Sequence, residues 1–263
     1  MNPWILAGIA TGILCLVFIP VYLVSRRLNN YGFVDVAWSY AFTLAAFIYG
    51  FAGSGTQPRR FVLTALVSLW SLRLGTHLYV RVRGHHPVED GRYQQLRRDW
   101  QDNLGPKMFG FFQLQAVSVV VLSTPFLLAM SNSTPTFHGL EIAGLAVWLT
   151  GLTGEATADA QLTRFKRAPE NRGKVCAAGL WRYSRHPNYF FEWLIWVGYA
   201  LIAVAAPWGW LGLISPAIIL YLLLRVTGIP LTEEQSVRSK GDAYRAYQRT
   251  TSAFVPWFPR RTN

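Results

Sequence analysis

The chain alternates between long apolar runs and shorter polar stretches. Seven of the runs are about as long as the 20 residues that an α-helix needs to cross a bilayer. They cover Pro3–Ser25, Gly32–Gly53, Arg60–Val80, Phe109–Met130, Gly139–Ala160, Asn188–Ala206 and Pro207–Gly228. No basic stretch precedes the first run and no small-residue cleavage site follows it, so we expect it to be retained. The pattern predicts an all-α fold, an integral membrane bundle of seven transmembrane helices forming a single domain over residues 1–263.

Composition excludes two other classes of protein. Charged residues make up 14% of the chain, whereas a soluble globular protein carries roughly a quarter. Hydrophobic residues account for 52% and aromatic residues for 15%, which is incompatible with a disordered chain. The two cysteines, Cys15 and Cys176, are too far apart in the sequence to suggest a disulfide framework or a thiolate metal site. We therefore expect no metal.

The basic residues predict the orientation in the membrane. The net charge is +12, and its basic residues lie between the apolar runs, which indicates membrane topology rather than nucleic-acid binding. Of the 25 Lys and Arg residues, 21 fall on one side, in loops 26–31, 81–108 and 161–187 and in the C-terminal tail. The positive-inside rule places that side in the cytoplasm and the N-terminus outside. The membrane would be the bacterial inner membrane, or the endoplasmic reticulum of a eukaryote.

Polar residues inside the predicted spans need an explanation, because a charge at mid-bilayer costs roughly 2.5–3.5 kcal/mol on insertion scales. They lie in the half of each helix nearest the basic side. Arginines near helix ends can reach the interface, but the short carboxylate side chains cannot. We therefore predict a polar cavity that opens to the cytoplasm. Its groups recur at a spacing of four, on one helix face: Asp35 with Ser39, Arg73 with His77 and Arg81, Glu155 with Asp159, and Asn188 with Glu192.

The loop between residues 161 and 187 is strongly basic and would suit a ligand with several phosphates. A cytoplasmic loop is also basic without any ligand, so the charge by itself is a weak signal. Neither G-x-G-x-x-G nor a P-loop motif occurs, and we expect no metal at His85 and His86. The basic residues of the loop are Arg164, Lys166, Arg167, Arg172, Lys174, Arg182 and Arg185.

One run of residues is specific enough to suggest a family. The run from Gly179 to Trp193 (GLWRYSRHPNYFFEW) resembles the C-terminal signature of the steroid 5-alpha-reductase (3-oxo-5-alpha-steroid 4-dehydrogenase) superfamily, and more closely that of its bacterial branch of uncharacterised membrane proteins. That branch also shows patterns similar to Tyr31–Trp38, Glu89–Tyr93 and Phe254–Pro259. The resemblance extends over nearly the whole chain from Asn30 onward.

This resemblance implies a membrane reductase that uses NADPH on the cytoplasmic side. Asp159, Asn188 and Glu192 fall on positions that contact the cofactor in the family, although Asn188 and Glu192 also suit a helix start. Lys166 and Lys174 stand where the better-known steroid reductases have Arg. The other implied cofactor contacts are Arg73, Arg81, Arg164, Arg172, Arg182, Arg185, His186 and Tyr189.

The departures from the family concern the substrate. Trp70 stands where the steroid enzymes have a Tyr, and Thr232–Gln235 replaces a His-rich cluster. The resemblance therefore implies reductase chemistry more firmly than a steroid, and the expected substrate is steroid-like or another isoprenoid or lipid. We expect a small hydrophobic enone that enters from the bilayer, with the oligomeric state open. A hydrogen-bond donor must stabilise the oxyanion formed when the enone accepts a hydride. The candidates are His77, Tyr40 and Tyr79, with Asp35 orienting the donor or itself protonated.

Two other classes of function compete with this interpretation. Arg185-His186-Pro187-Asn188-Tyr189 is also similar to the motif of isoprenylcysteine carboxyl methyltransferases, in which a Glu-Glu pair follows a helical hairpin, as Glu233-Glu234 would here. The cofactor would then be S-adenosylmethionine. The cationic loop and Arg73 favour the reductase, because they suit several phosphates better than a sulfonium. A transporter should carry polar groups in both halves of the bilayer, so it is the weakest alternative.

Overall fold

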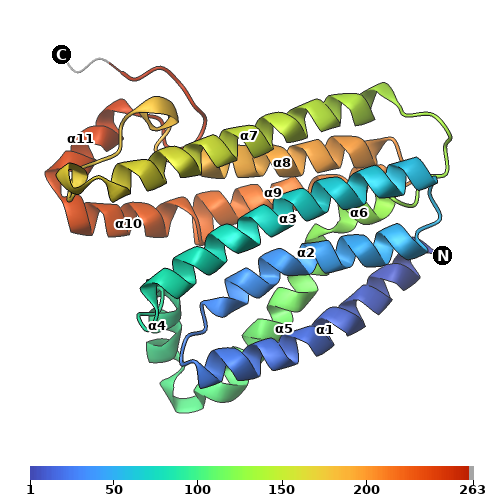
Figure 1. Ribbon diagram of the computed structural model, residues 1–263, viewed down its shortest axis with the longest axis horizontal. Helices are drawn as coiled ribbons and strands as arrows, with labels where there is room; N and C mark the ends of the chain where they lie inside the picture. Colours follow the sequence, from blue (N-terminus) through green and yellow to red (C-terminus); the bar gives the residue numbers. More distant parts are fainter. Residues whose placement is uncertain (261–263) are drawn as a thin grey trace. The chain divides into compact units, whose positions relative to one another are not determined.

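A computed structural model of the chain describes residues 1–260. Within these residues every regular element is helical, and one isolated β-bridge joins Ser184 and Ser252. The predicted all-α class is therefore confirmed. The chain divides into two compact units (Figure 1): Met1–Phe137 with Ala205–Leu211, and His138–Val204 with the residues from Gly212 onward. That the chain forms a single domain stays a prediction.

The first unit is a set of long helices around an aromatic core. It contains α1 (Pro3–Arg27), α2 (Phe33–Ala52), α3 (Gln57–His85), α4 (Gly91–Asp99), a 3-10 turn (Gln101–Asn103), α5 (Leu104–Leu122) and α6 (Thr124–Ala129). Helix α2 packs along α3, and α1 packs against α2 and α5. The buried ring of Phe42 lies 5.2 Å from Trp70 and 6.2 Å from Phe126. Large rings at such distances supply much of the packing energy of a core.

Arg59 is a basic residue at the end of α3 that lies away from the basic loops, and its contacts explain its place there. It is 1% exposed. A buried charge needs hydrogen-bond partners, and Arg59 finds them in the backbone oxygens of Asn132, Thr134 and Thr136, at 3.0, 2.7 and 3.0 Å. This arginine holds the turn after α6 in place.

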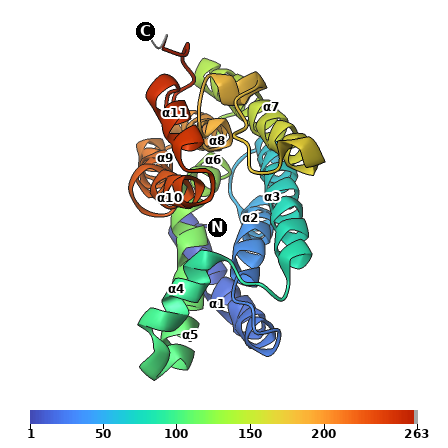
Figure 2. The same ribbon diagram turned by 90° about the vertical axis from the view of Figure 1, so that its left-hand side faces the viewer.

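The second unit is centred on two helices that pack closely together. It contains α7 (Gly139–Arg167), 3-10 turns at Pro169–Asn171 and Gly179–Arg182, α8 (Pro187–Val204), α9 (Ile214–Tyr221), a π-helical turn (Leu222–Val226), α10 (Ile229–Lys240) and α11 (Asp242–Thr250). A further 3-10 turn, Gly209–Leu213, precedes α9. Figure 2 shows α7 beside α8.

Glycines set the distance between α7 and α8. A Cβ atom at Gly144 would lie 2.7 Å from the backbone O of Gly198, and one at Gly198 would lie 2.8 Å from the backbone O of Gly144. At Gly151, it would lie 2.8 Å from the backbone N of Ile195. Small residues at such positions let two membrane helices approach each other closely.

Five segments of the described chain are long and apolar enough to cross a membrane: Pro3–Arg27, Phe33–Ala52, Gln57–His85, Gln101–Leu122 and Gly209–Lys240. They suggest an integral membrane protein. Two predicted spans, Gly139–Ala160 and Asn188–Ala206, correspond to α7 and α8, which are not among the five. Both helices carry polar residues inside them, at Glu155 and Asp159 on α7 and at Glu192 on α8. The count of seven and the orientation of the termini stay predictions.

Two span boundaries differ from the prediction. The predicted span Phe109–Met130 is interrupted after Leu122, where Pro125 starts a new helix because it lacks a backbone N–H. The last span runs on through α10, giving 32 residues, more than the roughly 20 that a bilayer requires. Since α10 carries four charged side chains in twelve residues, we take the bilayer segment to end before it.

Candidate functional site

A cationic pocket lies at the end of α7 in the second unit. Its volume is about 220 Å³. The side chain of Asn171 donates to the backbone O of Phe165 (3.1 Å), and Gly173 adopts φ 79°, which favours glycine, so the chain turns back after α7. This turn brings basic residues from distant positions together. The charged lining residues are Lys166, Arg172, Lys174 and Lys240.

Within residues 1–260 these four cations have no acidic counter-charge, since none of them forms an ion pair with an acidic side chain. Cys176 also lines the pocket. Burial raises the pKa of its thiol, although a hydrogen bond from Ala178 and the charges of Lys240 and Lys166 oppose the rise. The pocket is therefore positive and suited to an anion.

Three of the predicted ligand contacts meet in this pocket. Lys166, Arg172 and Lys174 line it, as one would expect of phosphate contacts. Arg164 on α7 and Arg182 after α7 are exposed and lie outside the lining. Lys240 was missed, because it lies at the far end of α10 and no local pattern connects it with the loop.

Asp159 and Asn188 connect α7 and α8 near this end of the unit. The side-chain amide of Asn188 donates to Asp159 Oδ1 at 3.3 Å. Helix α8 begins at Pro187, so Asn188 lies in its first turn and is not the cap. One turn further, Glu192 accepts a hydrogen bond from Trp196 Nε1 (2.9 Å). Asp159, Asn188 and Glu192 are thus all held by hydrogen bonds within the protein. Their role toward a cofactor stays a prediction.

Arg185 and His186 meet Glu233 of α10. Arg185 Nε donates to Glu233 Oε1 at 2.6 Å, and His186 Nε2 lies 3.3 Å from the same oxygen. Gln248 Nε2 donates to the other oxygen at 2.9 Å. Burial opposes ionisation, but the hydrogen bonds from His186, Arg185 and Gln248 outweigh it and lower the pKa of Glu233 to about 2. The Arg-His-Pro-x-Tyr motif is therefore held by an internal ion pair, with Tyr189 OH 3.1 Å from Thr232 Oγ1.

Helix α11 and the C-terminal segment, residues 251–260, hold this cluster in place. Tyr247 OH donates to the backbone O of Trp181 and of Ser184, the latter at 3.2 Å. Burial raises the pKa of Tyr247, as does the neighbouring Tyr244. Arg185 donates to the backbone O of Thr251 at 2.6 Å. These contacts use the arginine that the resemblance assigns to the cofactor, so its guanidinium also has a structural role.

In the first unit, two motifs that were predicted separately are in contact. Asp35 of α2 pairs with Arg92 (2.7 Å) and accepts a hydrogen bond from Tyr93 OH (2.6 Å). Glu89 pairs with Arg97 at 2.6 Å and accepts from the backbone N of Tyr31. Burial and then the Asp35 carboxylate raise the pKa of Tyr93 well above its usual value, so it stays a donor. The sequence did not predict these contacts, although Asp35, Tyr31, Glu89, Arg92 and Tyr93 all lie in the motifs Tyr31–Trp38 and Glu89–Tyr93; Arg97 lies outside them.

The remaining predicted side chains lie on α2 and α3. Tyr40 OH lies 3.1 Å from Thr76 Oγ1, and its ring covers Gly75, where a Cβ atom would come within 2.6 Å of it. His77 and Arg81 are exposed and Arg73 is half-buried. Tyr79, 38% exposed, accepts a hydrogen bond from Arg83 (3.0 Å). Of the two tyrosines, Tyr40 therefore has the hydroxyl group that is held more firmly in place.

Among residues 1–260 no three His, Cys, Asp or Glu side chains gather in a way that could hold a metal ion. The structure is thus a helical protein with segments apolar enough to span a membrane and with a pocket lined by four basic residues. The profile of DUF1295, described as a protein of unknown function, matches residues 21–251. The chain belongs to this family, which is related to the steroid 5-alpha-reductase superfamily.

A curated protein is also similar to the chain. The chain is 28% identical over 267 residues to an uncharacterized protein of Schizosaccharomyces pombe, covering 89% of this chain and 74% of the yeast protein. No solved structure matches the chain. The family relationship therefore rests on sequence.

Proposed function

We propose that this protein is an NADPH-dependent membrane reductase that transfers a hydride to the activated C=C bond of a lipid-soluble enone. The cationic pocket of Lys166, Arg172, Lys174 and Lys240 is the observation that carries this proposal. Four cations that have no acidic partner in the described part of the chain favour a ligand with several negative charges. NADPH carries a 2′-phosphate in addition to its pyrophosphate, whereas S-adenosylmethionine carries a positive sulfonium.

The chemistry of the pocket fits the phosphates of the cofactor. A volume of about 220 Å³ is below that of pockets for drug-sized ligands, about 300–1,000 Å³, so we assign it only a phosphate-bearing part. Asp159 and Asn188, joined by a hydrogen bond, offer polar groups beside α8 for the rest of the cofactor. When bound, NADPH would supply the hydride; the protein would orient it and exclude water.

The chain must also stabilise the oxygen of the enone. Hydride addition at the β-carbon moves an electron pair onto this oxygen, and a donor side chain stabilises it and supplies the proton. We propose Tyr40 first, because its ring is fixed against Gly75 and its hydroxyl lies beside Thr76. His77 and Tyr79 are the alternatives, and Asp35, whose carboxylate accepts hydrogen bonds from Arg92 and Tyr93, would orient the donor.

Tyr40→Phe tests this assignment, with Tyr79→Phe as its matched control. Removal of a donor to a developing oxyanion costs about 10²–10³ in turnover. We expect a loss of that size for Tyr40→Phe, with unchanged NADPH affinity and thermal midpoint, and less than threefold for Tyr79→Phe. The reverse order of effects would assign the donor to Tyr79.

Methyl transfer from S-adenosylmethionine is the second candidate function. It is favoured by the contact of Arg185 and His186 with Glu233, since an Arg-His-Pro-x-Tyr motif and a following Glu-Glu pair are also features of isoprenylcysteine carboxyl methyltransferases. In this chain the cluster satisfies its own hydrogen bonds. It is therefore also explained as a structural junction.

A thermal-shift measurement on the purified protein in detergent separates the two functions. The ligands are NADPH, NADP, NADH and S-adenosylmethionine, and the variant is Glu192→Ala. A ligand at a hundredfold excess over its dissociation constant stabilises the folded state by about 2.7 kcal/mol. We expect stabilisation by NADPH that is lost in the variant, whose midpoint without ligand serves as the control for folding. Stabilisation by S-adenosylmethionine alone would reject the reductase.

A further inference from the structure

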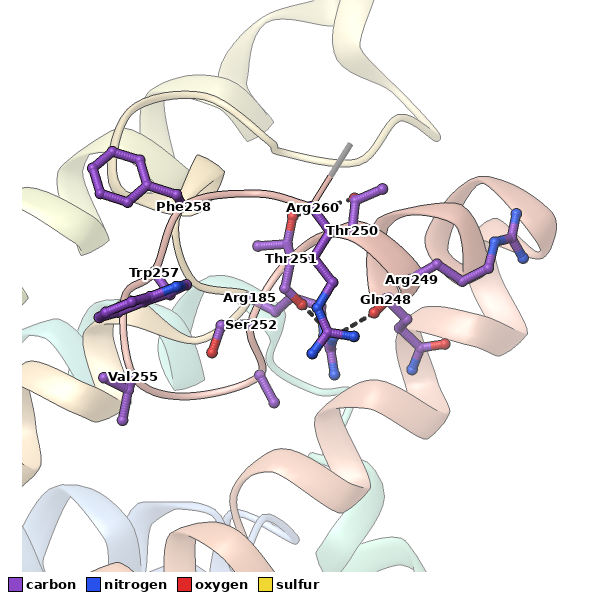
Figure 3. A pocket seen from close by; sticks show the side chains of 11 residues that line it. Arg185, Gln248, Arg249, Thr250, Thr251, Ser252, Val255, Trp257, Phe258 and Arg260 are labelled. Carbon is purple, nitrogen blue, oxygen red and sulfur yellow. Dashed lines mark hydrogen bonds between the residues drawn. The ribbon is translucent and has the colours of Figure 1, made fainter. Parts of the chain in front are cut away.

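A second pocket lies in the same unit, apart from the cationic pocket. It lies between α11 and the C-terminal segment and has a volume of about 490 Å³ (Figure 3). Its lining includes three arginines, Arg185, Arg249 and Arg260, and the hydroxyl residues Thr250 and Ser252. No residue of the cationic pocket described above contributes to it. The two sites are therefore distinct.

The C-terminal segment that encloses this pocket is fixed by backbone hydrogen bonds. Ser252 O accepts from the backbone N of Arg185 (2.8 Å), and the backbone N of Trp257 donates to Tyr183 O (2.9 Å). The backbone N of Arg260 donates to Thr250 O at 2.8 Å, which closes the loop. The wall of the pocket is therefore held in place by backbone hydrogen bonds.

The same segment presents large apolar side chains to its surroundings. Trp257 is 70% exposed, Phe258 is 77% exposed and Val255 is 52% exposed. In Figure 3 the rings of Trp257 and Phe258 lie to one side of the arginines. Large apolar side chains gathered on one surface mark an interaction site. Trp beside basic residues is typical of the interface between lipid tails and headgroups.

Anchoring of the segment places these rings near the end of a helix. The ring of Phe254 packs on Phe190 and Trp193, in the first turns of α8, at centroid distances of 5.6 and 5.9 Å. Trp193 in turn donates to the backbone O of Pro216 in α9 (3.1 Å), within the segment long and apolar enough to span a membrane. The exposed rings are thus connected, through Phe254 and α8, to a segment that is apolar enough to span a membrane.

The charges of the pocket are only partly used within the protein. Arg185 is neutralised by Glu233. Arg249 and Arg260 are exposed, and in residues 1–260 neither forms an ion pair. In Figure 3 the side chain of Arg249 extends away from Arg185 and Arg260. Because Arg249 is exposed, its guanidinium is able to turn toward a phosphodiester beside Arg260, which would accept paired hydrogen bonds from Arg. The adjacent apolar rings suit acyl chains.

We propose that this pocket binds the headgroup of an anionic phospholipid, with its phosphodiester on Arg249 and Arg260 and with Trp257 and Phe258 in the interface of the bilayer. The charge and the exposed rings together select a lipid over a soluble anion, which would leave the rings in water. The site is independent of the reductase proposal. It would fix the C-terminal segment, and through it the Arg185–Glu233 junction, at the membrane surface.

The test measures the thermal midpoint of the full chain in neutral detergent as phosphatidylglycerol is added. The variant is Arg249→Gln/Arg260→Gln, and the matched control is Arg27→Gln/Arg167→Gln, which removes two other exposed arginines. Each basic side chain near an anionic lipid surface contributes about fivefold to binding. We expect the apparent affinity for phosphatidylglycerol to fall about 25-fold in the variant, at about fivefold per arginine, and less than threefold in the control. Phosphatidylcholine should stabilise neither.

Two further arms complete the test. Trp257→Ala/Phe258→Ala should weaken phosphatidylglycerol binding while leaving the midpoint without lipid unchanged, because both rings are exposed. Glycerol 3-phosphate, which has the charge but no acyl chains, should not stabilise the protein at the same concentration. Equal stabilisation by glycerol 3-phosphate, or equal lipid affinity in the variant and the control, would overturn the proposal.

Discussion

Replacing Glu233 with Gln removes the charge at the junction of Arg185, His186 and Gln248 while keeping the shape of the side chain. The side chains of Arg185 and Glu233 are only 10% and 17% exposed. In the variant Arg185 keeps its two backbone acceptors, Gln248 O and Thr251 O, but loses its counter-charge. We expect the variant to fold with a clearly lowered stability.

Two arguments give the same magnitude for this loss. Lowering the pKa of Glu233 from 4.5 to about 2 corresponds to about 3 kcal/mol at neutral pH, at 1.36 kcal/mol per pKa unit. Breaking a buried ion pair by removing one partner costs about 3–5 kcal/mol. Because the folded pKa lies below the unfolded one, this stability is present above about pH 4.5 and is lost as the pH falls toward 2.

The assay is thermal denaturation of the purified protein in detergent at pH 7 and at pH 3. Since 1 kcal/mol moves the midpoint of a chain of this size by about 2–4 °C, Glu233→Gln should lower it by about 6–12 °C at pH 7. Glu234→Gln is the matched control, because its carboxylate is 58% exposed and pairs with Arg238 on the surface. We expect a change below about 3 °C for this control.

The pH series provides a second comparison. Wild type should lose more stability than Glu233→Gln between pH 7 and pH 3, so that their midpoints converge in acid. Equal midpoints for the Glu233 and Glu234 variants at pH 7, or a constant gap between wild type and Glu233→Gln over the pH range, would refute the reasoning.

Two further substitutions test the packing of each unit. Gly198→Ala should lower the stability by at least about 2 kcal/mol through overpacking against Gly144. The control is Gly110→Ala, with nothing within 4 Å of its Cβ position, which should leave the thermal midpoint unchanged or slightly raised. Equal midpoints for the two variants would reject the close approach of α7 and α8. Tyr93→Phe removes a buried donor to the Asp35 carboxylate and should cost about 2 kcal/mol in the same assay; an unchanged midpoint would mean that this hydrogen bond contributes no stability.

The apolar pattern predicted the helical class because the period and length of the runs are local properties. Five predicted spans correspond to segments that are apolar enough to cross a bilayer. The boundaries were less accurate, since the break between α5 and α6 depends on Pro125, and α9 passes through a π-helical turn that no residue pattern announces. The spans at α7 and α8 stay predictions because polar residues occupy their inner faces.

The candidate site was predictable where its residues are neighbours in sequence. Lys166, Arg172 and Lys174 lie in one loop, and their charge predicted a common role. Lys240 lies on another helix, and only the fold brings it to the same pocket. Glu233 was noticed as half of a Glu-Glu pair, but its contact with Arg185 depends on the packing of α10. Pairings between elements need tertiary structure, which a single sequence does not specify locally.

The central claim is that the pocket at the end of α7 binds the phosphates of NADPH. The most direct measurement is the dissociation constant of NADPH by calorimetry for wild type, for Lys166→Gln/Lys174→Gln, and for Arg245→Gln/Arg249→Gln, which removes two exposed charges of α11 outside the pocket. Each lost charge-assisted hydrogen bond weakens binding roughly tenfold, so we predict about 100-fold weaker NADPH binding to the lysine variant. Binding to the arginine variant should be less than threefold weaker. The wild type should bind NADPH more tightly than NADH. Absence of NADPH binding to wild type, or equal affinity in the lysine variant, would contradict the account.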